Sequence, residues 1–164
     1  MSATQTTPRH KLWDLIMDIR LAMLVTRDGG LLRSRPLLSH PDEKDGVIWF
    51  LTAKSDSKVM EILNEQAVNL SYMDMDHSHF VSVSGKAYPT LNRAKLDEVW
   101  SPYSEAWFPE GKDDPELVMI KIVPEQAEYW DMERREMLTL AEFLEAARDG
   151  RLEDIGENRK IDRP

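Results

Sequence analysis

Two pairs of residues have side chains that could bind an anion together. Arg33 and Arg35 are two positions apart in an apolar segment, and on a β-strand this spacing places both side chains on one face. Ser57 and Lys58 follow at the expected start of a helix, where free backbone amides, a hydroxyl and an ammonium favour a bound anion. Because an arginine can donate two hydrogen bonds to one phosphate group, these residues together predict a phosphate site.

The charge balance allows a second interpretation of the same residues. The chain contains 30 Asp and Glu against 21 Lys and Arg, a formal net charge of -9, so each basic side chain has many acids with which to pair. Taken alone, the residues favour solvation or pairing with these acids over a phosphate site. An acidic protein repels the phosphate backbone of duplex nucleic acid. We therefore expect no nucleic-acid partner, and any bound anion must lie in a local basic pocket.

Two aromatic segments could contact a planar ligand. Residues 106–111 contain Trp107 and Phe108, and residues 128–131 contain Trp130. Flat side chains in such segments can stack on a ring, but they serve equally well in a core or a subunit interface. Taken by themselves, the residues favour packing over ligand binding.

Other kinds of site find little support. His77 and His79, beside Asp74 and Asp76, could bind a metal, but no third ligand is marked by its spacing, so a polar turn is favoured and no metal is expected. Residues 133–136 are a charge run typical of a solvated connection. The chain has no cysteine, which excludes disulfides, thiolate metal sites and cysteine nucleophiles. Its sequence contains no P-loop, nucleophile elbow or dinucleotide fingerprint.

Short strands and a few helices are predicted to position these residues. Periodicity predicts strands at residues 21–26, 31–39, 47–52, 67–73, 79–88 and 117–123, with a seventh candidate at 127–131. It predicts helices at residues 10–19, 92–100 and 140–148, and a further helix that starts within residues 55–58. Gly29 and Gly30 predict a tight turn between the first two strands. Residues 40–46 and 101–115 are expected to be irregular.

Many short strands with few helices between them predict a mainly β fold, an antiparallel barrel with peripheral helices. We expect a disordered arm at residues 1–10, one domain at 11–150, and a charged, frayed tail at 151–164. The polar start predicts no secretory signal. Because no apolar run approaches the roughly 20 residues of a membrane helix, we expect a cytoplasmic protein without a membrane partner.

An ordered series of short segments between Lys11 and Asp131 carries a family resemblance. The series is Leu12-Trp13-Asp14-Leu15-Ile16, Met23-Leu24-Val25-Thr26, Leu32-Arg33-Ser34-Arg35-Pro36, Trp49-Phe50-Leu51-Thr52, Ser57-Lys58-Val59, Val68-Asn69-Leu70-Ser71-Tyr72, Val81-Ser82-Val83-Ser84-Gly85-Lys86-Ala87, Ala106-Trp107-Phe108-Pro109-Glu110-Gly111 and Ala127-Glu128-Tyr129-Trp130-Asp131. No single motif is specific, but the order is. It resembles the general stress protein branch of the pyridoxamine-phosphate-oxidase-like split barrels that bind flavin mononucleotide (FMN).

The resemblance implies a six-stranded split β-barrel that forms a homodimer, with two FMN sites at the dimer interface. It implies that Arg35 grips the FMN phosphate and that Ser57 and Lys58 complete the clamp. It also assigns a second group of residues to the flavin ring. These are Pro36, Leu37, Leu51 and Thr52 along two strands, Trp130 from the other subunit, and Trp107 and Phe108 at the pocket wall.

The chain also departs from the oxidase pattern. The oxidase has a C-terminal Arg-x-His-x-Arg stretch that holds its pyridoxal phosphate substrate, whereas residues 131–136 of this chain contain no histidine. A glutamine that touches the flavin in the oxidase falls near Phe80. The resemblance therefore implies a retained FMN site and a lost vitamin site, so pyridoxamine 5′-phosphate oxidase activity itself is not expected.

Three functions fit these expectations. The first is a flavin-dependent oxidoreductase linked to stress response, with NAD(P)H or another small redox substrate. Since FMN carries the redox chemistry, this hypothesis names no catalytic residue. The second is a flavin-binding or redox-sensing dimer without turnover. The third is a barrel that has lost FMN and serves as an interaction module.

Overall fold

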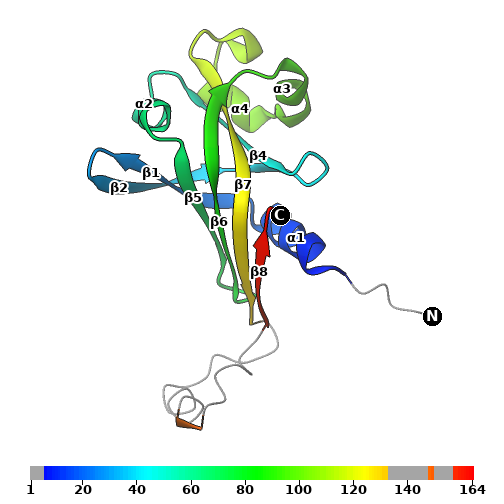
Figure 1. Cartoon of the computed structure of the whole chain (residues 1–164). Coiled ribbons are helices and arrows are strands. Elements are labelled where there is room, and N and C mark those ends of the chain that lie inside the picture. The colour runs from blue at the N-terminus through cyan, green and yellow to red at the C-terminus, as the bar shows by residue number, and fades with distance from the viewer. Residues whose placement is uncertain (1–5, 133–147, 150–156) are drawn as a thin grey trace, which may run out of the picture.

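The computed structural model describes residues 6–132, 148–149 and 157–164, and its main feature is one curled antiparallel sheet (Figure 1). The strands are β1 (Leu21–Asp28), β2 (Leu31–Leu38), β3 (His40–Asp42), β4 (Val47–Ala53), β5 (Ala67–Asp74), β6 (His79–Thr90), β7 (Leu117–Asp131) and β8 (Glu157–Asp162). The helices are α1 (Pro8–Ile19), α2 (Ser57–Asn64), α3 (Arg93–Val99), α4 (Pro102–Trp107) and the 3₁₀ turn η1 (Gly111–Asp113).

The strand order is β2-β1-β5-β6-β7-β4-β3, with β8 added to β7. Each of these pairings is antiparallel. The mainly β, antiparallel fold class predicted from the sequence is therefore confirmed. The sheet has eight strands rather than six, and it is not closed into a barrel, because no ladder among the described residues joins the outer strands β2 and β3.

The first hairpin shows how the sequence pattern produces the sheet. Alternate residues of β1 point inward, so Ala22, Leu24 and Thr26 are buried while Leu21 and Met23 are exposed. The turn to β2 passes through Gly29, whose φ of 59° is in the left-handed region that glycine adopts without a Cβ clash. The register fixed by this turn pairs Leu24 with Arg35, which places Arg35 on the inward-facing row.

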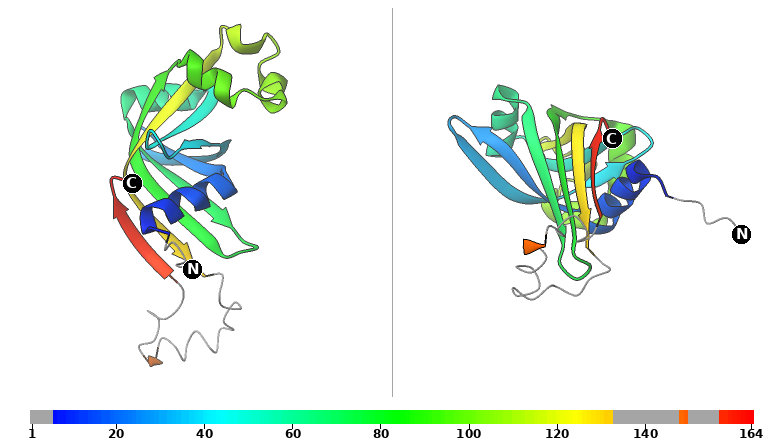
Figure 2. Two further views of the ribbon diagram at one scale, coloured as in Figure 1. Left: turned by 90° about the vertical axis from the view of Figure 1, so that its right-hand side faces the viewer. Right: turned by 60° about the horizontal axis from the view of Figure 1, so that its bottom comes forward.

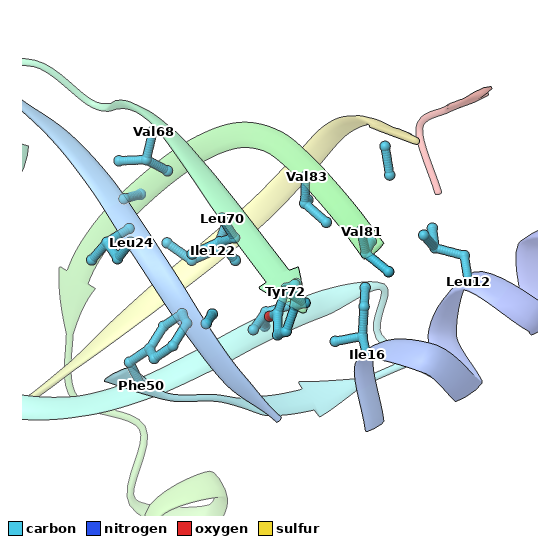
Figure 3. Close-up of a cluster of buried hydrophobic side chains, with 14 of the residues drawn as sticks. Leu12, Ile16, Leu24, Phe50, Val68, Leu70, Tyr72, Val81, Val83 and Ile122 are labelled. Carbon is cyan, nitrogen blue, oxygen red and sulfur yellow. The ribbon is translucent and has the colours of Figure 1, made fainter. Parts of the chain in front are cut away.

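The main core fills the concave side of the sheet and continues under α1 (Figure 3). Leu12 and Ile16 of α1 approach the side chains of the strands, which come from β1, β4, β5, β6 and β7. A smaller second cluster lies on the other face of β4 and includes Trp49, Leu96 and Phe108. β4 is consequently buried on both faces, with α3 and α4 gathered at the end of the molecule opposite the β5–β6 hairpin (Figure 2).

β7 is one continuous strand, where the sequence suggested two segments around Pro124. The register between β6 and β7 shifts between Ser84 and Gly85, so that Gly85 lies opposite Pro124 and Ser84 opposite Gln126. This bulge absorbs the extra residue, and the strand continues with its alternation preserved. The first half of β7 pairs with β4 and the second half with β8.

The end of the chain also differs from expectation, because part of the segment expected to fray forms β8. The pairing of β8 with β7 is reinforced by side chains: Tyr129 donates to Glu157 at 2.9 Å, and Lys11 Nζ lies 2.6 Å from Glu157 and 2.5 Å from Asp131. Ile161 packs against the main core. These partners are distant in sequence, so the charged residues of this segment by themselves predicted a frayed tail and not a strand.

Two segments expected to be irregular contain regular elements, and one predicted helix cannot be compared with the structure. The loop predicted at residues 40–46 contains β3, and the irregular stretch at 101–115 contains α4 and η1. The helix predicted at residues 140–148 lies almost wholly outside the described residues. None of the helices in the described part of the chain is long and apolar enough to cross a membrane.

Replacing Gly85 with alanine is expected to destabilise the protein by about 1–3 kcal/mol, the usual cost of overpacking. A Cβ at this position would clash with the carbonyl oxygen of Val123 and lie 3.0 Å from Pro124 Cα. Urea unfolding measures the change. Gly30 is the matched control, because a Cβ there meets nothing within 4 Å, and its alanine variant should stay within about 0.5 kcal/mol of wild type. Equal stability of the two variants would contradict the bulge argument.

Candidate phosphate-binding site

The candidate site lies at the start of α2, which packs against β1 and β6. Asp56 caps this helix, its side chain accepting a hydrogen bond from the Lys58 amide at 3.2 Å. The buried positions of α2 are Lys58, Val59, Glu61 and Ile62. They share one helical face, so a lysine and a glutamate turn inward together with the apolar residues.

Glu61 connects this helix to the two arginines of β2. Its Oε1 accepts from Arg33 at 2.8 Å, and its Oε2 accepts from Arg35 at 2.8 Å. Thr26 also donates to Glu61 and accepts from Arg35 at 2.6 Å. The Glu61 side chain is 6% exposed, against 16% for Arg35 and 46% for Arg33. Glu61 is therefore a buried counter-ion that fixes the orientation of both guanidinium groups.

The pKa of Glu61 reflects these contacts. Burial alone would raise the pKa of the carboxyl group, but the hydrogen bonds from Thr26 and Arg35 and the charges of both arginines outweigh it, so the pKa is lower than usual. Glu61 is consequently ionised at neutral pH.

Lys58 provides the second cation of the site. Its side chain is 5% exposed, and its ammonium donates to Thr52 Oγ1 at 3.0 Å and pairs with Asp56. Burial would raise the pKa of Asp56, but hydrogen bonds from Lys58 and the charges of Lys58 and Arg35 lower it. Lys58 and Arg35 thus act on the same carboxylate, and the arrangement is able to hold an anion between them.

The structure brings several of the predicted site residues together. Arg35, Lys58 and Thr52 belong to this cluster, and Ser57 Oγ accepts from Arg33 at 3.4 Å. β2, which carries Arg35, lies close to β4, which carries Thr52. Two cations, two hydroxyls and a helix N-terminus therefore meet at one place.

The neighbouring residues predicted to follow the flavin ring lie on the same two strands. Leu37 is two residues beyond Arg35 on β2 and packs against the main core, whereas Pro36 faces the outer side and is exposed. Leu51 precedes Thr52 on β4 but packs against the second cluster. These four side chains therefore face in different directions, and only the strand backbones run together.

Of the predicted aromatic residues, Trp130 lies far from this cluster within one chain. Trp130 pairs with Phe80 near the end of β7, whereas Thr52 pairs with Val118 near its start. The 15 residues of β7 span roughly 45–50 Å when extended. Phe108 is buried in the second cluster and Trp107, beside it, is 69% exposed.

The two acids of the site, Asp56 and Glu61, were not predicted as site residues from the sequence. A signal for Glu61 was present. It follows Lys58 by one helical turn and falls between Val59 and Ile62, on the stripe that the apolar residues define. A charged pair on an apolar stripe indicates buried ionic contacts.

Comparison with known proteins places the chain in a family. A family model described as pyridoxamine 5′-phosphate oxidase like matches residues 7–154. General stress protein 26 of Bacillus subtilis is 32% identical over 121 residues, which cover 71% of this chain and 84% of that protein. The chain belongs to the pyridoxamine 5′-phosphate oxidase-like family.

Solved structures of this oxidase-like family agree with the fold. A general stress protein 26 from Jannaschia sp. CCS1 is 27% identical, with a TM-score of 0.71 over 93% of this chain and 96% of that one. A protein of Xanthomonas citri described as a general stress FMN/FAD binding protein is 26% identical, with a TM-score of 0.68 over 79% of this chain and 91% of that one. The family resemblance inferred from the sequence is confirmed.

Proposed function

We propose that this member of the oxidase-like family binds FMN, with the phosphate held by Arg35 and Lys58 at the start of α2, and that it acts as a flavin-dependent oxidoreductase. The observation that carries the proposal is the position of the buried Lys58 ammonium, paired with Asp56 at the start of α2, within the field of Arg35 on the neighbouring strand. The description of the Xanthomonas citri protein as FMN/FAD binding supports the same class of ligand.

The donor set fits a phosphate monoester. Arg35 supplies a planar fork, Lys58 a point charge, and Ser57 a hydroxyl at the first position of α2. The helix N-terminus adds backbone amides and a favourable dipole. Since Lys58 is buried and held by Thr52, its position is largely set before the anion arrives, which lowers the entropic cost of binding.

The flavin ring is proposed to lie along β2 and β4. The backbones of Pro36 and Leu37 on one strand and Leu51 and Thr52 on the other would orient it. Proline has no N–H to donate, so Pro36 would contact the ring by packing and through its carbonyl. When bound, FMN supplies the electron-transfer chemistry, and the chain binds it, orients it and excludes water.

We propose that the protein is a homodimer in which Trp130 reaches the flavin of the other subunit. The outer face of the sheet carries apolar side chains on neighbouring strands. Leu21, Met23 and Met73 are 56%, 40% and 60% exposed, and Phe80 and Trp130 are half-buried beside them. Apolar surface on a sheet face is typical of an interface. A second copy would cover it and would supply the aromatic wall that one chain lacks.

Flavin titration tests the phosphate assignment. Replacing Arg35 or Lys58 with alanine is expected to weaken FMN binding by about 1.5–3 kcal/mol, the worth of a hydrogen bond to a charged group. This corresponds to roughly 10- to 150-fold in Kd. Isothermal titration or quenching of flavin fluorescence measures the change. Riboflavin, which has no phosphate, should bind wild type and variants with nearly equal affinity.

Arg27→Ala is the matched control, since Arg27 is an exposed arginine on the adjacent strand and should leave FMN binding unchanged. Equal FMN affinity of wild type, Arg35→Ala and Lys58→Ala would refute the phosphate assignment. Steady-state oxidation of NAD(P)H by the FMN complex with an electron acceptor tests the oxidoreductase part. Tight FMN binding without such turnover would instead support a redox-sensing or flavin-storage role.

A further inference from the structure

The acids of the site differ in how firmly they are held. Glu61 is 6% exposed and fixed by Arg33, Arg35 and Thr26. Asp56 instead pairs with Lys58 and lies in the field of Arg35, and its side chain is 37% exposed. A half-exposed carboxylate can rotate into water at lower cost than a buried one, provided that another anion replaces it beside Lys58. Asp56 is therefore the acid that is able to leave.

Asp56 occupies hydrogen-bond donors of Lys58 that a bound phosphate would use. An ammonium has three donors, and in Lys58 one goes to Thr52 and one to Asp56. Asp56 also accepts from the Lys58 amide at the helix N-terminus, and it lies in the field of Arg35. The side-chain ammonium, the amide and the guanidinium charge are the groups assigned above to the phosphate.

We propose that the Asp56 carboxylate occupies the position of the flavin phosphate in the ligand-free protein and competes with it. This inference rests on the proposed function. For a phosphate to take two donors from Lys58, Asp56 must move away, and a carboxylate that stays nearby repels the incoming dianion. Asp56 is thus a specificity-determining residue: it lowers affinity for phosphate-bearing ligands and leaves affinity for the flavin ring unchanged.

Substitution of Asp56 by asparagine tests this directly. Asparagine is as good a helix cap as aspartate, so α2 should keep its start while the competing charge is lost. The expected result is an FMN Kd about tenfold lower than in wild type, since one charge–charge repulsion near the surface is removed. The riboflavin Kd should change less than twofold. Asp56→Ser, which also caps helices well, should behave in the same way.

Asp45→Asn is the matched control. It makes the same change in net charge at an exposed position of the turn between β3 and β4, and FMN affinity should not change. If both Asp56 variants bind FMN with wild-type or weaker affinity, the inference is overturned, and Asp56 instead holds Lys58 in place. That result would leave the proposed function intact, because the proposed function fails only if Arg35→Ala and Lys58→Ala leave FMN binding unchanged.

A second readout uses inorganic phosphate alone. Phosphate should raise the melting temperature of the Asp56→Asn variant at lower concentrations than it does for wild type, because an anion that binds only the folded state stabilises it. Sodium chloride at equal ionic strength separates this effect from screening. Identical phosphate responses of the variant and the wild-type protein would also overturn the inference.

Discussion

Replacing Glu61 with glutamine is expected to lower the free energy of unfolding by about 3 kcal/mol, the lower end of the cost of removing one partner of a buried ion pair. Arg35 would lose its carboxylate partner while only 16% exposed. Arg33 is 46% exposed, so water would compensate it in part. The amide of glutamine could accept from one arginine but would carry no charge.

Denaturant unfolding at pH 7 measures this effect, and Glu65→Gln is its control. Glu65 ends the same helix but is exposed, and its substitution should cost less than about 0.5 kcal/mol. Similar losses for the two variants would show that helix propensity, and not the buried ion pairs, carries the effect.

The contribution of Glu61 to the free energy of unfolding should also decrease as the pH falls. Its pKa in the folded protein is below the usual 4.5. The unfolded chain therefore takes up a proton on Glu61 at a higher pH than the folded protein does. The stabilisation is complete above about pH 4.5 and is lost as the pH falls through the folded-state pKa. The difference between wild type and Glu61→Gln should thus shrink in acid. A constant difference from pH 7 to pH 3 would argue against the ionic explanation.

Local patterns in the sequence were sufficient to predict most elements of the fold. The alternation in β1, the Gly29 turn and the start of α2 depend on neighbouring residues, and each lies where the pattern indicates. β8 could not be predicted in this way. Its residues are charged, and they form a strand because β7 offers a free edge and because Lys11 and Tyr129 bind Glu157 from distant positions.

Some residues of the candidate site could likewise be predicted from local sequence, and others could not. Arg35, Ser57 and Lys58 were predictable from residue type and position, because strands and helix starts are locally encoded. Asp56 was predictable only as part of the helix start. For Glu61 the sequence showed only its place on the apolar stripe, because its partners depend on how α2 docks on β1. Only the docked helix shows that Glu61 meets Arg33 and Arg35.

Mixing Arg35→Ala and Trp130→Ala subunits is expected to restore about a quarter of the FMN sites. This holds if each site combines Arg35 of one chain with Trp130 of the other. Random association of Arg35→Ala and Trp130→Ala chains makes about half of the dimers mixed. In each mixed dimer one site carries both substitutions and the other carries neither. The parent variants have no intact site.

The measurement is FMN binding after the two variants have been unfolded and refolded together, at an FMN concentration that saturates wild type but neither parent. Arg35→Ala should bind roughly 10- to 150-fold more weakly. Trp130→Ala should weaken FMN binding by about 1–2 kcal/mol, the scale of a planar aromatic contact with its buried area. Recovery of about a quarter of the wild-type sites is the expected result.

The pair Arg35→Ala and Lys58→Ala provides the decisive control. These two residues act on Asp56 within one chain, so every site in a mixed dimer carries one substitution and no wild-type site can form. Recovery in the first mixture and none in the second would place the phosphate clamp in one subunit and the aromatic wall in the other. Trp130 lies near one end of β7, whereas Thr52 pairs with Val118 near the other end. Recovery in neither mixture would therefore mean that the flavin does not bridge subunits and that Trp130 lies outside its site.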